Sequence, residues 1–373
     1  MKVLISRDIF DNSKDERGKL ELNFLIYLIT VKKCYELLID DSDILSSDYM
    51  KGMGDNETRI FEWAFTQAMT SSAKCDCQIS KSGEAETKNK VFTREEAIVY
   101  LLQPLSLLVE NSVNDAHFLR ALFKAYATLE SLRDAESNNE LQFVNAGGCM
   151  NVENFIKAQV AHYKGKIKFL RYWVLLDGDK RFPTDAVNKY NKVTAKLKDW
   201  NVEYHILNKR SMENYMPDDA IEQMRIKTNA DWINAYRSLS EEQKDYFNIA
   251  GGFYDDLTKE NKATVLKKEK KHSNKDKNKK KTSFIKPLLS VAQRNLYNDM
   301  SKAHFKALEK GIQLPITGSF KEVFPTYYNH QIVTKKRLDD RISRQNNPHE
   351  LQDIVDSIQK LISVPLKLGR IKN

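Results

Sequence analysis

The sequence predicts an α/β protein whose core is a largely parallel sheet with crossover helices, and three observations carry this prediction. Between about residues 93 and 222, short apolar runs of strand type alternate with longer stretches of helical period. Only 13 glycines and 8 prolines are present, too few for the many turns of an all-β sandwich. Hydrophobic residues make up 41% of the 373 positions, enough for a sizeable core, and this length suggests two or three domains.

The central segment, residues 96–222, supplies the alternating elements. Strands are predicted at Leu105–Val109, 142–144, Tyr172–Leu176 and 203–207, and helices at 115–133, 152–163 and 185–200. Strands that are separated by helices of this length pair in parallel, because each crossover helix returns the chain to the same end of the sheet. We therefore expect a Rossmann-like sheet whose strands all end at one edge.

The flanking segments have other patterns. Residues 1–95 form an expected N-terminal α/β module with a strand at 2–6, a helix at 20–33, a second strand at 35–39 and a polar loop at 71–89. Residues 223–261 are predicted to be a helical extension, 262–283 a lysine-rich mobile tether, and 284–373 a helical C-terminal region. Five segments therefore make up the expected organisation.

Positive charge is concentrated in one of these segments. The chain has a formal net charge of +9, and residues 262–281 hold ten lysines against two acidic residues. The lysines expected to bind nucleic acid there are Lys267, Lys268, Lys270, Lys271, Lys279, Lys280 and Lys281. Such a tether attracts phosphates without sequence preference, although a solubilising linker has the same composition.

The composition also indicates where the chain works. No apolar run approaches the roughly 18 residues that a membrane span needs. The four cysteines, Cys34, Cys75, Cys77 and Cys149, are too scattered for a disulfide framework or a zinc site. We therefore expect reduced thiols in a cytoplasmic protein that does not contact membranes.

Acidic residues follow three of the expected strands. They are Glu110 and Asp115 after Leu105–Val109, Asp177 and Asp179 after Tyr172–Leu176, and Glu213 after 203–207. Ligands of open parallel sheets bind at the carboxyl ends of the strands, so these carboxylates are expected to converge. Oxygen ligands without histidine or cysteine suit Mg²⁺ or Mn²⁺, and Gly178 lets a backbone or a phosphate approach closely. Lys180, Lys209 and Arg210 are candidate phosphate contacts, or else ordinary solvated charges.

These motifs resemble a known family. Val109-Glu110, a following acid with Phe118-Leu119, and a hydrophobic strand that ends in Asp-Gly-Asp look like the TOPRIM domain. The stretch 209–215, Lys-Arg-Ser-Met-Glu-Asn-Tyr, is similar to a segment of OLD-like nucleases and of TOPRIM effectors in bacterial antiphage defence. The resemblance covers about residues 100–220.

The resemblance implies a TOPRIM catalytic domain and a Mg²⁺-dependent endonuclease that hydrolyses phosphodiester bonds of DNA or RNA. It implies that Glu110 is the essential acid, acting as a metal ligand or as a general base. It also implies that Asp177 and Asp179 bind Mg²⁺ or Mn²⁺. Asp115 and Glu213 would complete a site for two ions, and Lys180 would join the catalytic set. Two cations can activate the attacking water and stabilise the leaving oxygen of a phosphodiester.

Other features narrow the kind of TOPRIM protein. A topoisomerase needs a large toroidal body, and primases and recombination scaffolds carry zinc modules that these cysteines do not provide. No G-x-x-x-x-G-K-[ST] loop is present, so we expect an ABC- or SMC-like ATPase partner on a separate chain, and a homodimer is compatible. The alternative is a non-catalytic nucleic-acid-binding or regulatory subunit with a degenerate TOPRIM fold.

The N-terminal module raises a second alternative. Its strand ends, Ser6-Arg7-Asp8 and Asp40-Asp41, faintly resemble those of PIN-like nucleases. A structural or partner-binding module is the other interpretation of the same 95 residues.

Overall fold

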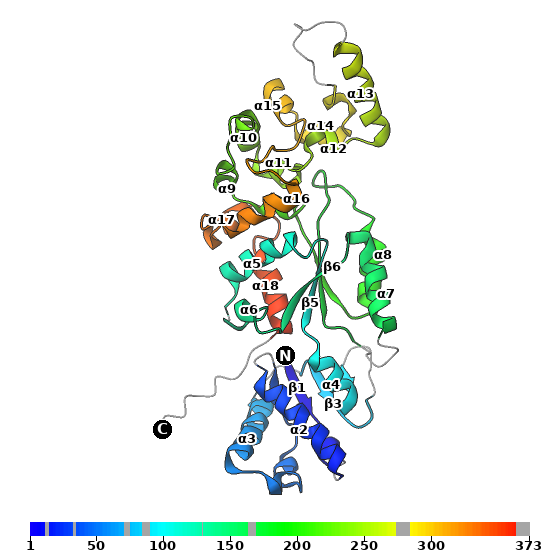
Figure 1. The fold of residues 1–373 in the computed structure, drawn as a ribbon, viewed down its shortest axis with the longest axis vertical. Coiled ribbons are helices and arrows are strands. Elements are labelled where there is room, and N and C mark those ends of the chain that lie inside the picture. Colours follow the sequence, from blue (N-terminus) through cyan, green and yellow to red (C-terminus); the bar gives the residue numbers. More distant parts are fainter. Residues whose placement is uncertain are drawn as a thin grey trace.

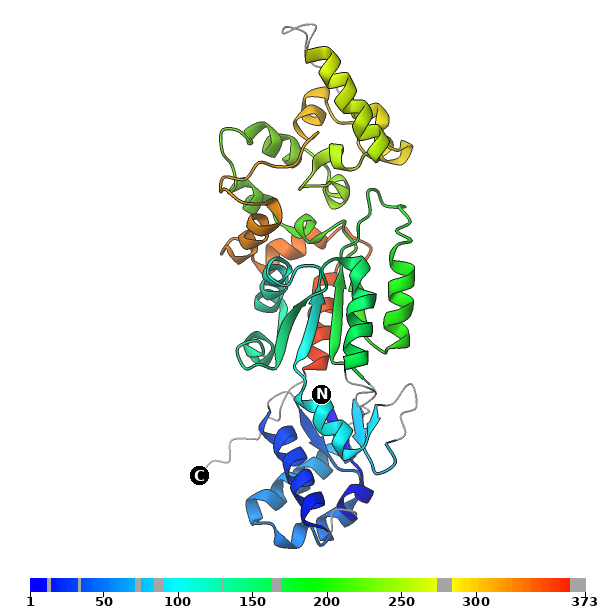
Figure 2. The same cartoon turned by 45° about the vertical axis from the view of Figure 1, so that its right-hand side comes forward.

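A computed structural model describes residues 1–11, 15–32, 35–70, 75–83, 90–128, 130–162, 169–273 and 284–362. The molecule is elongated, with an N-terminal sheet unit, a central sheet unit and a helical region stacked along its long axis (Figures 1 and 2). Each sheet has four parallel strands. The predicted α/β class is therefore confirmed. Within the described ranges, no helix combines the length and the apolar character that crossing a bilayer requires.

The N-terminal sheet has the strand order β2-β1-β3-β4. Its strands are β1 (Lys2–Ile5), β2 (Glu36–Leu38), β3 (Cys77–Ile79) and β4 (Val91–Phe92), and the surrounding elements are α1 (Arg7–Asp11), α2 (Glu16–Val31), η1 (Ser42–Ser46), η2 (Met50–Gly52), α3 (Asp55–Thr70) and α4 (Arg94–Leu102). Helix α2 begins where the Asp15 carboxylate accepts the Gly18 N–H at 2.8 Å. Strand β3 lies within the stretch expected to be a polar loop, of which 71–74 and 84–89 fall outside the described residues.

The central sheet has the order β6-β5-β7-β8. Its strands are β5 (Leu105–Val109), β6 (Leu141–Asn145), β7 (Tyr172–Leu176) and β8 (Glu203–Ile206), with the helices α5 (Asn114–Tyr126), α6 (Glu130–Asp134), α7 (Val152–His162) and α8 (Tyr190–Asp199) and the turn η3 (Cys149–Asn151). All five residues of β5 are buried, because helices cover both faces of the sheet (Figure 1). Leu107 belongs to the core on the α5 side, and Leu108 belongs to the core on the α7 and α8 side.

The order of the central strands places a topological switch point between β5 and β7. The chain passes from β5 to β6 on one side, and then crosses over to place β7 on the other side of β5. The two crossovers therefore diverge between β5 and β7, and the carboxyl ends of these strands border the gap where open α/β sheets bind ligands. The first sheet repeats the arrangement, with β1 and β3 in the places of β5 and β7.

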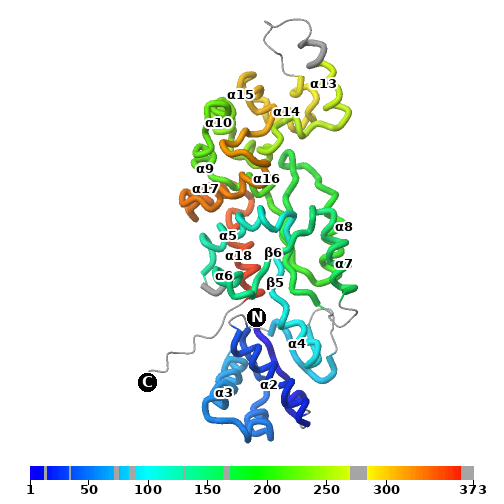
Figure 3. Tube along the Cα trace, viewed as in Figure 1, coloured from blue at the N-terminus to red at the C-terminus, as the bar shows by residue number. Residues whose placement is uncertain are grey.

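Short helices form the rest of the molecule. They are η4 (Met212–Tyr215), α9 (Asp218–Glu222), α10 (Ala230–Arg237), α11 (Glu241–Tyr246), α12 (Gly252–Asp255), α13 (Lys259–Ser273), η5 (Lys286–Leu288), α14 (Val291–Leu296), α15 (Lys302–Ala307), α16 (Phe320–Val323), η6 (Phe324–Asn329), α17 (Lys335–Ile342) and α18 (Glu350–Leu361). The last helix, α18, returns to the central sheet beside α5 (Figure 3). Buried Glu350 fixes it there by accepting hydrogen bonds from the Asn208 N–H at 2.7 Å and the Tyr215 hydroxyl at 2.6 Å. The C-terminal region thus includes part of the central unit.

The predicted mobile tether is wrong in its first half. Residues 259–273 form the helix α13, which buries Val265 and carries an ion pair between Lys262 and Asp255 at 2.8 Å. Lysine has a good helix propensity, so a lysine-rich sequence need not be irregular. The second half, 274–283, lies outside the described residues.

Candidate functional site

The predicted acidic residues meet at the carboxyl edge of the central sheet. Glu110 directly follows β5, and Asp177 and Asp179 directly follow β7. Asp115 lies in the first turn of α5, and Glu213 lies in the turn η4 that follows β8. Their charges act on one another, since Glu213, Glu110, Asp115 and Asp179 all raise the pKa of Asp177. The carboxyl ends of β5 and β7 therefore carry a cluster of acidic side chains.

Three ligand atoms of this site surround one point. One atom each of Glu110, Cys149 and Asp179 lies within 4.8 Å of the other two. Cys149 begins η3, just beyond the end of β6, and is only 9% exposed. Two carboxylates and a thiol at this spacing can share a divalent cation. The thiol is a softer donor than the all-oxygen set that the sequence predicts.

Backbone geometry holds the Asp-Gly-Asp turn in place. A Cβ atom on Gly178 would lie 2.0 Å from the Lys209 carbonyl oxygen and 2.5 Å from that of Leu207. The predicted close approach at Gly178 is thus an approach of the chain that follows β8. Asp179 adopts a left-handed conformation with φ of 52°, and its N–H donates to the Arg210 carbonyl oxygen at 2.6 Å. Glycine is required at 178 because no side chain fits there.

Two side chains from the start of α8 hold Asp179. Lys189 forms an ion pair with its Oδ2 atom, and the Tyr190 hydroxyl donates to the same oxygen. Asp177 is held from another direction, because its Oδ1 atom accepts the Met212 N–H at 3.2 Å. Different groups therefore hold the two aspartates, and among the described residues Asp179 is the one of the two that forms an ion pair.

Burial and repulsion from neighbouring carboxylates raise the pKa values of Asp177, Asp115 and Glu110. The pKa of Asp177 lies well above its ordinary value, first because of burial and next because of the Glu213 charge. Burial likewise raises the pKa of Asp115 to about 7, although the Asn111 N–H donates to its carboxylate at 2.8 Å. Burial and Asp179 raise the pKa of Glu110, whereas Lys189 and Lys321 lower it. A bound cation would remove the cost of ionising these groups together.

Without a metal, this cluster should make the protein less stable as the pH rises. The pKa of Asp115 increases from 3.8 to about 7 on folding, so the folded chain binds more protons than the unfolded chain between these values. Its contribution is therefore greatest below the lower value and is lost as the pH rises through the upper one. Thermal melts in chelator at about pH 5 and about pH 8 should show a larger fall for the wild type than for Asp115→Asn. Equal falls would contradict this effect.

The structure places the three predicted phosphate contacts elsewhere. Lys209 is fully buried, forms an ion pair with Asp245 and donates to the Arg341 carbonyl oxygen at 2.8 Å. It is therefore a structural cation and not a surface contact, which corrects the prediction. Arg210 forms an ion pair with Asp256 at 2.7 Å. Lys180 lines a separate pocket of about 460 Å³ beside Glu241 and Arg341, so its catalytic role is not supported.

The described lysines of the predicted tether lie on α13, outside the central sheet unit. Lys267 and Lys268 are exposed on α13, at the end of the molecule distant from the N-terminal unit (Figure 1). Lys270 and Lys271 belong to the same helix, and Lys279, Lys280 and Lys281 lie outside the described residues.

Sequence reasoning missed four members of the site. Lys189 and Tyr190 start the helix after β7, Cys149 follows β6, and Lys321 comes from α16. The position of Cys149 could have been inferred, because it follows a predicted strand that ends at the same edge. Nothing in the sequence around Lys321 indicates that it belongs to the site, because the packing of the C-terminal helices brings it there.

Comparisons with protein-family models, with curated proteins and with solved structures found no match for this chain.

Proposed function

We propose that the chain is a metal-dependent nuclease with a TOPRIM-type catalytic unit in residues 96–222. The observation that carries this proposal is the convergence of five carboxylates at the point where the central crossovers diverge. Apart from Lys189 at Asp179, their mutual repulsion is not balanced by ion pairs among the described residues. Carboxylates that are costly to ionise, such as Asp177 and Asp115, are expected where a cation binds during function.

The side chains of the cluster fit Mg²⁺ or Mn²⁺. Carboxylate oxygens are the donors that these ions prefer, and burial, followed by the charges of the neighbouring carboxylates, raises the pKa values of Asp115 and Asp177. Bound, such ions would stabilise charge on a phosphodiester and lower the pKa of an attacking water. We propose that two ions bind here. Glu110 and Asp179 would be ligands of one ion, and Asp177 and Glu213 would be ligands of the other.

The residues around the cluster have separate roles in this proposal. Glu110, half-buried with a raised pKa, is suited to accept a proton from the attacking water. Lys189 holds Asp179 in its orientation. Lys321 is exposed near the two acids whose pKa values it lowers, so it can face a phosphate oxygen at the entrance. Exposed lysines of α13 would add affinity for DNA or RNA that depends on salt.

One observation favours the second candidate, a non-catalytic nucleic-acid-binding or regulatory subunit. The Lys189 ammonium already neutralises Asp179, as expected of a site in which a side chain has replaced a metal ion. Incubation of the purified chain with Mg²⁺ or Mn²⁺ and plasmid, single-stranded DNA or total RNA separates the two candidates. The nuclease proposal predicts cleavage that chelator abolishes. Binding without cleavage of any substrate would favour the regulatory subunit.

We further propose that an ATPase partner controls this activity, within an antiphage defence system. Four apolar side chains on α2 are exposed at helical spacing: Leu20, Phe24, Tyr27 and Val31, with exposed fractions between 42% and 68%. Such a stripe typically marks a contact with another protein.

The ATPase should co-purify with the wild type and not with Phe24→Ser/Tyr27→Ser. A chain that is fully active alone, harmless to its host and free of an ATPase would contradict this proposal.

A further inference from the structure

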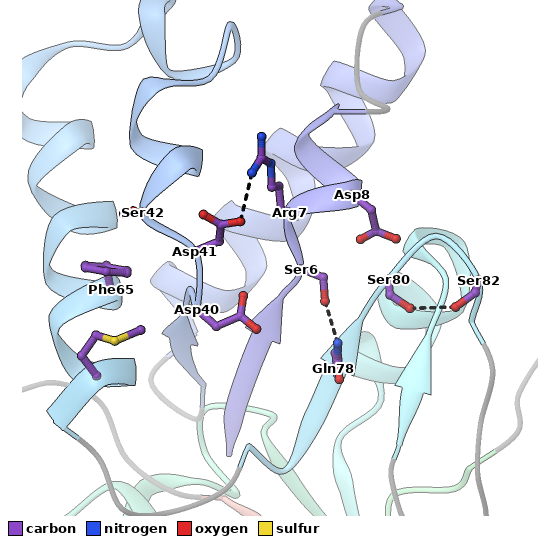
Figure 4. Close-up of a pocket in the computed structure, with 11 residues that line it drawn as sticks. Ser6, Arg7, Asp8, Asp40, Asp41, Ser42, Phe65, Gln78, Ser80 and Ser82 are labelled. Atoms are coloured by element: carbon purple, nitrogen blue, oxygen red, sulfur yellow. Dashed lines mark hydrogen bonds and ion pairs between the residues drawn. The ribbon is translucent and has the colours of Figure 1, made fainter.

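A second pocket lies at the corresponding place in the N-terminal sheet. It has a volume of about 750 Å³ and is lined by the ends of β1, β2 and β3 and by α3 (Figure 4). The strand order makes the gap between β1 and β3 the point where the crossovers diverge. Its volume is within the range of small-molecule sites. The function proposed for the central site does not involve this pocket.

The lining offers hydroxyl, amide and carboxylate groups in one space. At the end of β1, the Ser6 hydroxyl accepts a hydrogen bond from the Gln78 amide at 2.7 Å, which leaves its own O–H to donate into the pocket. Across from it, the hydroxyls of Ser80 and Ser82 are 3.3 Å apart. Their hydrogen bond uses one of the two hydroxyl protons, so the other can be donated to a ligand. Ser80 is 8% exposed, so the hydroxyl is a fixed part of the wall.

The acidic residues of the pocket are not arranged as a metal centre. Among the described residues, the group of three ligand atoms that converges on one point is in the central unit, and none from this pocket joins it. Asp41 shares the Arg7 guanidinium with Asp43, and Asp8 accepts the Lys81 N–H at 2.8 Å. This arrangement does not favour the PIN-like interpretation of these strand ends.

Asp40 is different from these residues. It follows β2, is exposed, and makes no hydrogen bond or ion pair within the described parts of the chain. In Figure 4 its carboxylate points toward Ser6, with Phe65 of α3 on its other side. A carboxylate at the end of the second strand is positioned to accept both hydroxyls of a ribose, as in dinucleotide-binding sheets.

The opposite wall is apolar. Phe65 and Met69 lie one turn apart on α3, so they share a face of the helix, and Met69 is 58% exposed. An aromatic ring and a thioether offer a surface on which a nucleobase can stack. Three carboxylates against one guanidinium make the lining negative, and the turn after β1 has no glycine. Both features disfavour a bound polyphosphate.

We propose that this pocket binds a ribonucleoside, with Asp40 on its 2′ and 3′ hydroxyls and its base against Phe65 and Met69. A free ribonucleoside and the 3′-terminal nucleoside of an RNA present this same chemistry. The binding does not depend on cleavage at the central site. It can therefore be measured in a chain with Glu110→Gln, which keeps RNA intact if the chain is a nuclease.

Calorimetric titration of this Glu110→Gln chain tests the proposal, with adenosine, guanosine, cytidine and uridine in metal-free buffer. At least one ribonucleoside should bind. Its 2′-deoxy counterpart should bind about tenfold more weakly, because it lacks one of the two hydroxyls proposed to donate to Asp40. Asp40→Asn should weaken binding about tenfold. Asp55→Asn, an exposed change on α3 outside the pocket, should leave binding unchanged. Absence of binding at millimolar concentration, equal affinity for the deoxynucleoside, or unchanged affinity in Asp40→Asn would overturn the proposal.

An RNA oligonucleotide distinguishes the two sources. If the pocket takes an RNA end, an oligonucleotide with a free 3′ diol should bind more tightly than the nucleoside, and a 3′-phosphate should abolish the gain. If the ligand is a free ribonucleoside, the oligonucleotides with a 3′ diol and with a 3′-phosphate should bind equally, because their affinity then comes from the basic surface alone. Both results support the ribose site and assign its ligand.

Discussion

Glu110→Gln should reduce metal-dependent cleavage by about 10³-fold, equivalent to about 4 kcal/mol of barrier. Glu110 contributes one of three ligand atoms that lie within 4.8 Å of one another, and it is our candidate for the proton acceptor. Glutamine preserves the size and one oxygen of the side chain, but it cannot accept a proton at neutral pH or offer a charge to a cation. Initial rates with saturating substrate measure the loss.

The control separates chemistry from folding and binding. Glu62→Gln makes the same change at an exposed position of α3, so it should cleave like the wild type. Glu110→Gln should retain its nucleic-acid affinity in a filter-binding assay, because the change removes a negative charge from the site and leaves the basic surface as it is. A Glu110→Gln chain that cleaves at the wild-type rate would contradict the role of this residue.

Gly178→Ala should destabilise the central unit by about 3 kcal/mol, the upper end of overpacking effects. The new methyl group would lie 2.0 Å and 2.5 Å from the carbonyl oxygens of Lys209 and Leu207. Both neighbours are backbone atoms, so the chain after β8 must move away, and the Arg210 carbonyl that Asp179 binds moves with it. Denaturant unfolding should show the loss in stability.

A glycine without close neighbours provides the control for the steric contact that is expected to destabilise Gly178→Ala. Gly52 has nothing within 4 Å of a built Cβ atom and no left-handed conformation, so Gly52→Ala should change stability by less than about 0.5 kcal/mol. Metal binding should weaken only in Gly178→Ala. If both variants were equally stable, the close approach at Gly178 would not be a constraint on the fold.

The sequence predicted the two inner strands of the central sheet well because they are buried. Leu105–Val109 and Tyr172–Leu176 are mostly apolar runs, and both strands have these bounds in the structure. The acids at their ends could then be placed by the topology of parallel sheets alone. By contrast, β3 has three residues, of which only Cys77 and Ile79 face inward, so it does not stand out from the polar sequence around it.

The roles of the basic residues could not be predicted from the sequence. A lysine in a loop is expected to be solvated, and no local pattern indicates that it is buried. Lys209 is buried through its ion pair with Asp245, 36 residues further along the chain. Lys189 reaches Asp179 across the turn before α8, and Lys321 reaches the site from α16. These pairings are tertiary, and no local pattern encodes them.

Calorimetric titration of Mg²⁺ or Mn²⁺ into the metal-free chain at about pH 8 tests the cation site most directly, since a higher pH favours the ionised carboxylates that a cation binds. The wild type should bind the ion, and so should Asp199→Asn, a change at an exposed carboxylate at the end of α8. Asp177→Asn should bind about tenfold or more weakly, since it removes a charge from the centre of the cluster. A wild-type chain that binds neither ion, or an Asp177→Asn chain that binds as the wild type does, would contradict a divalent-cation site at the end of β7.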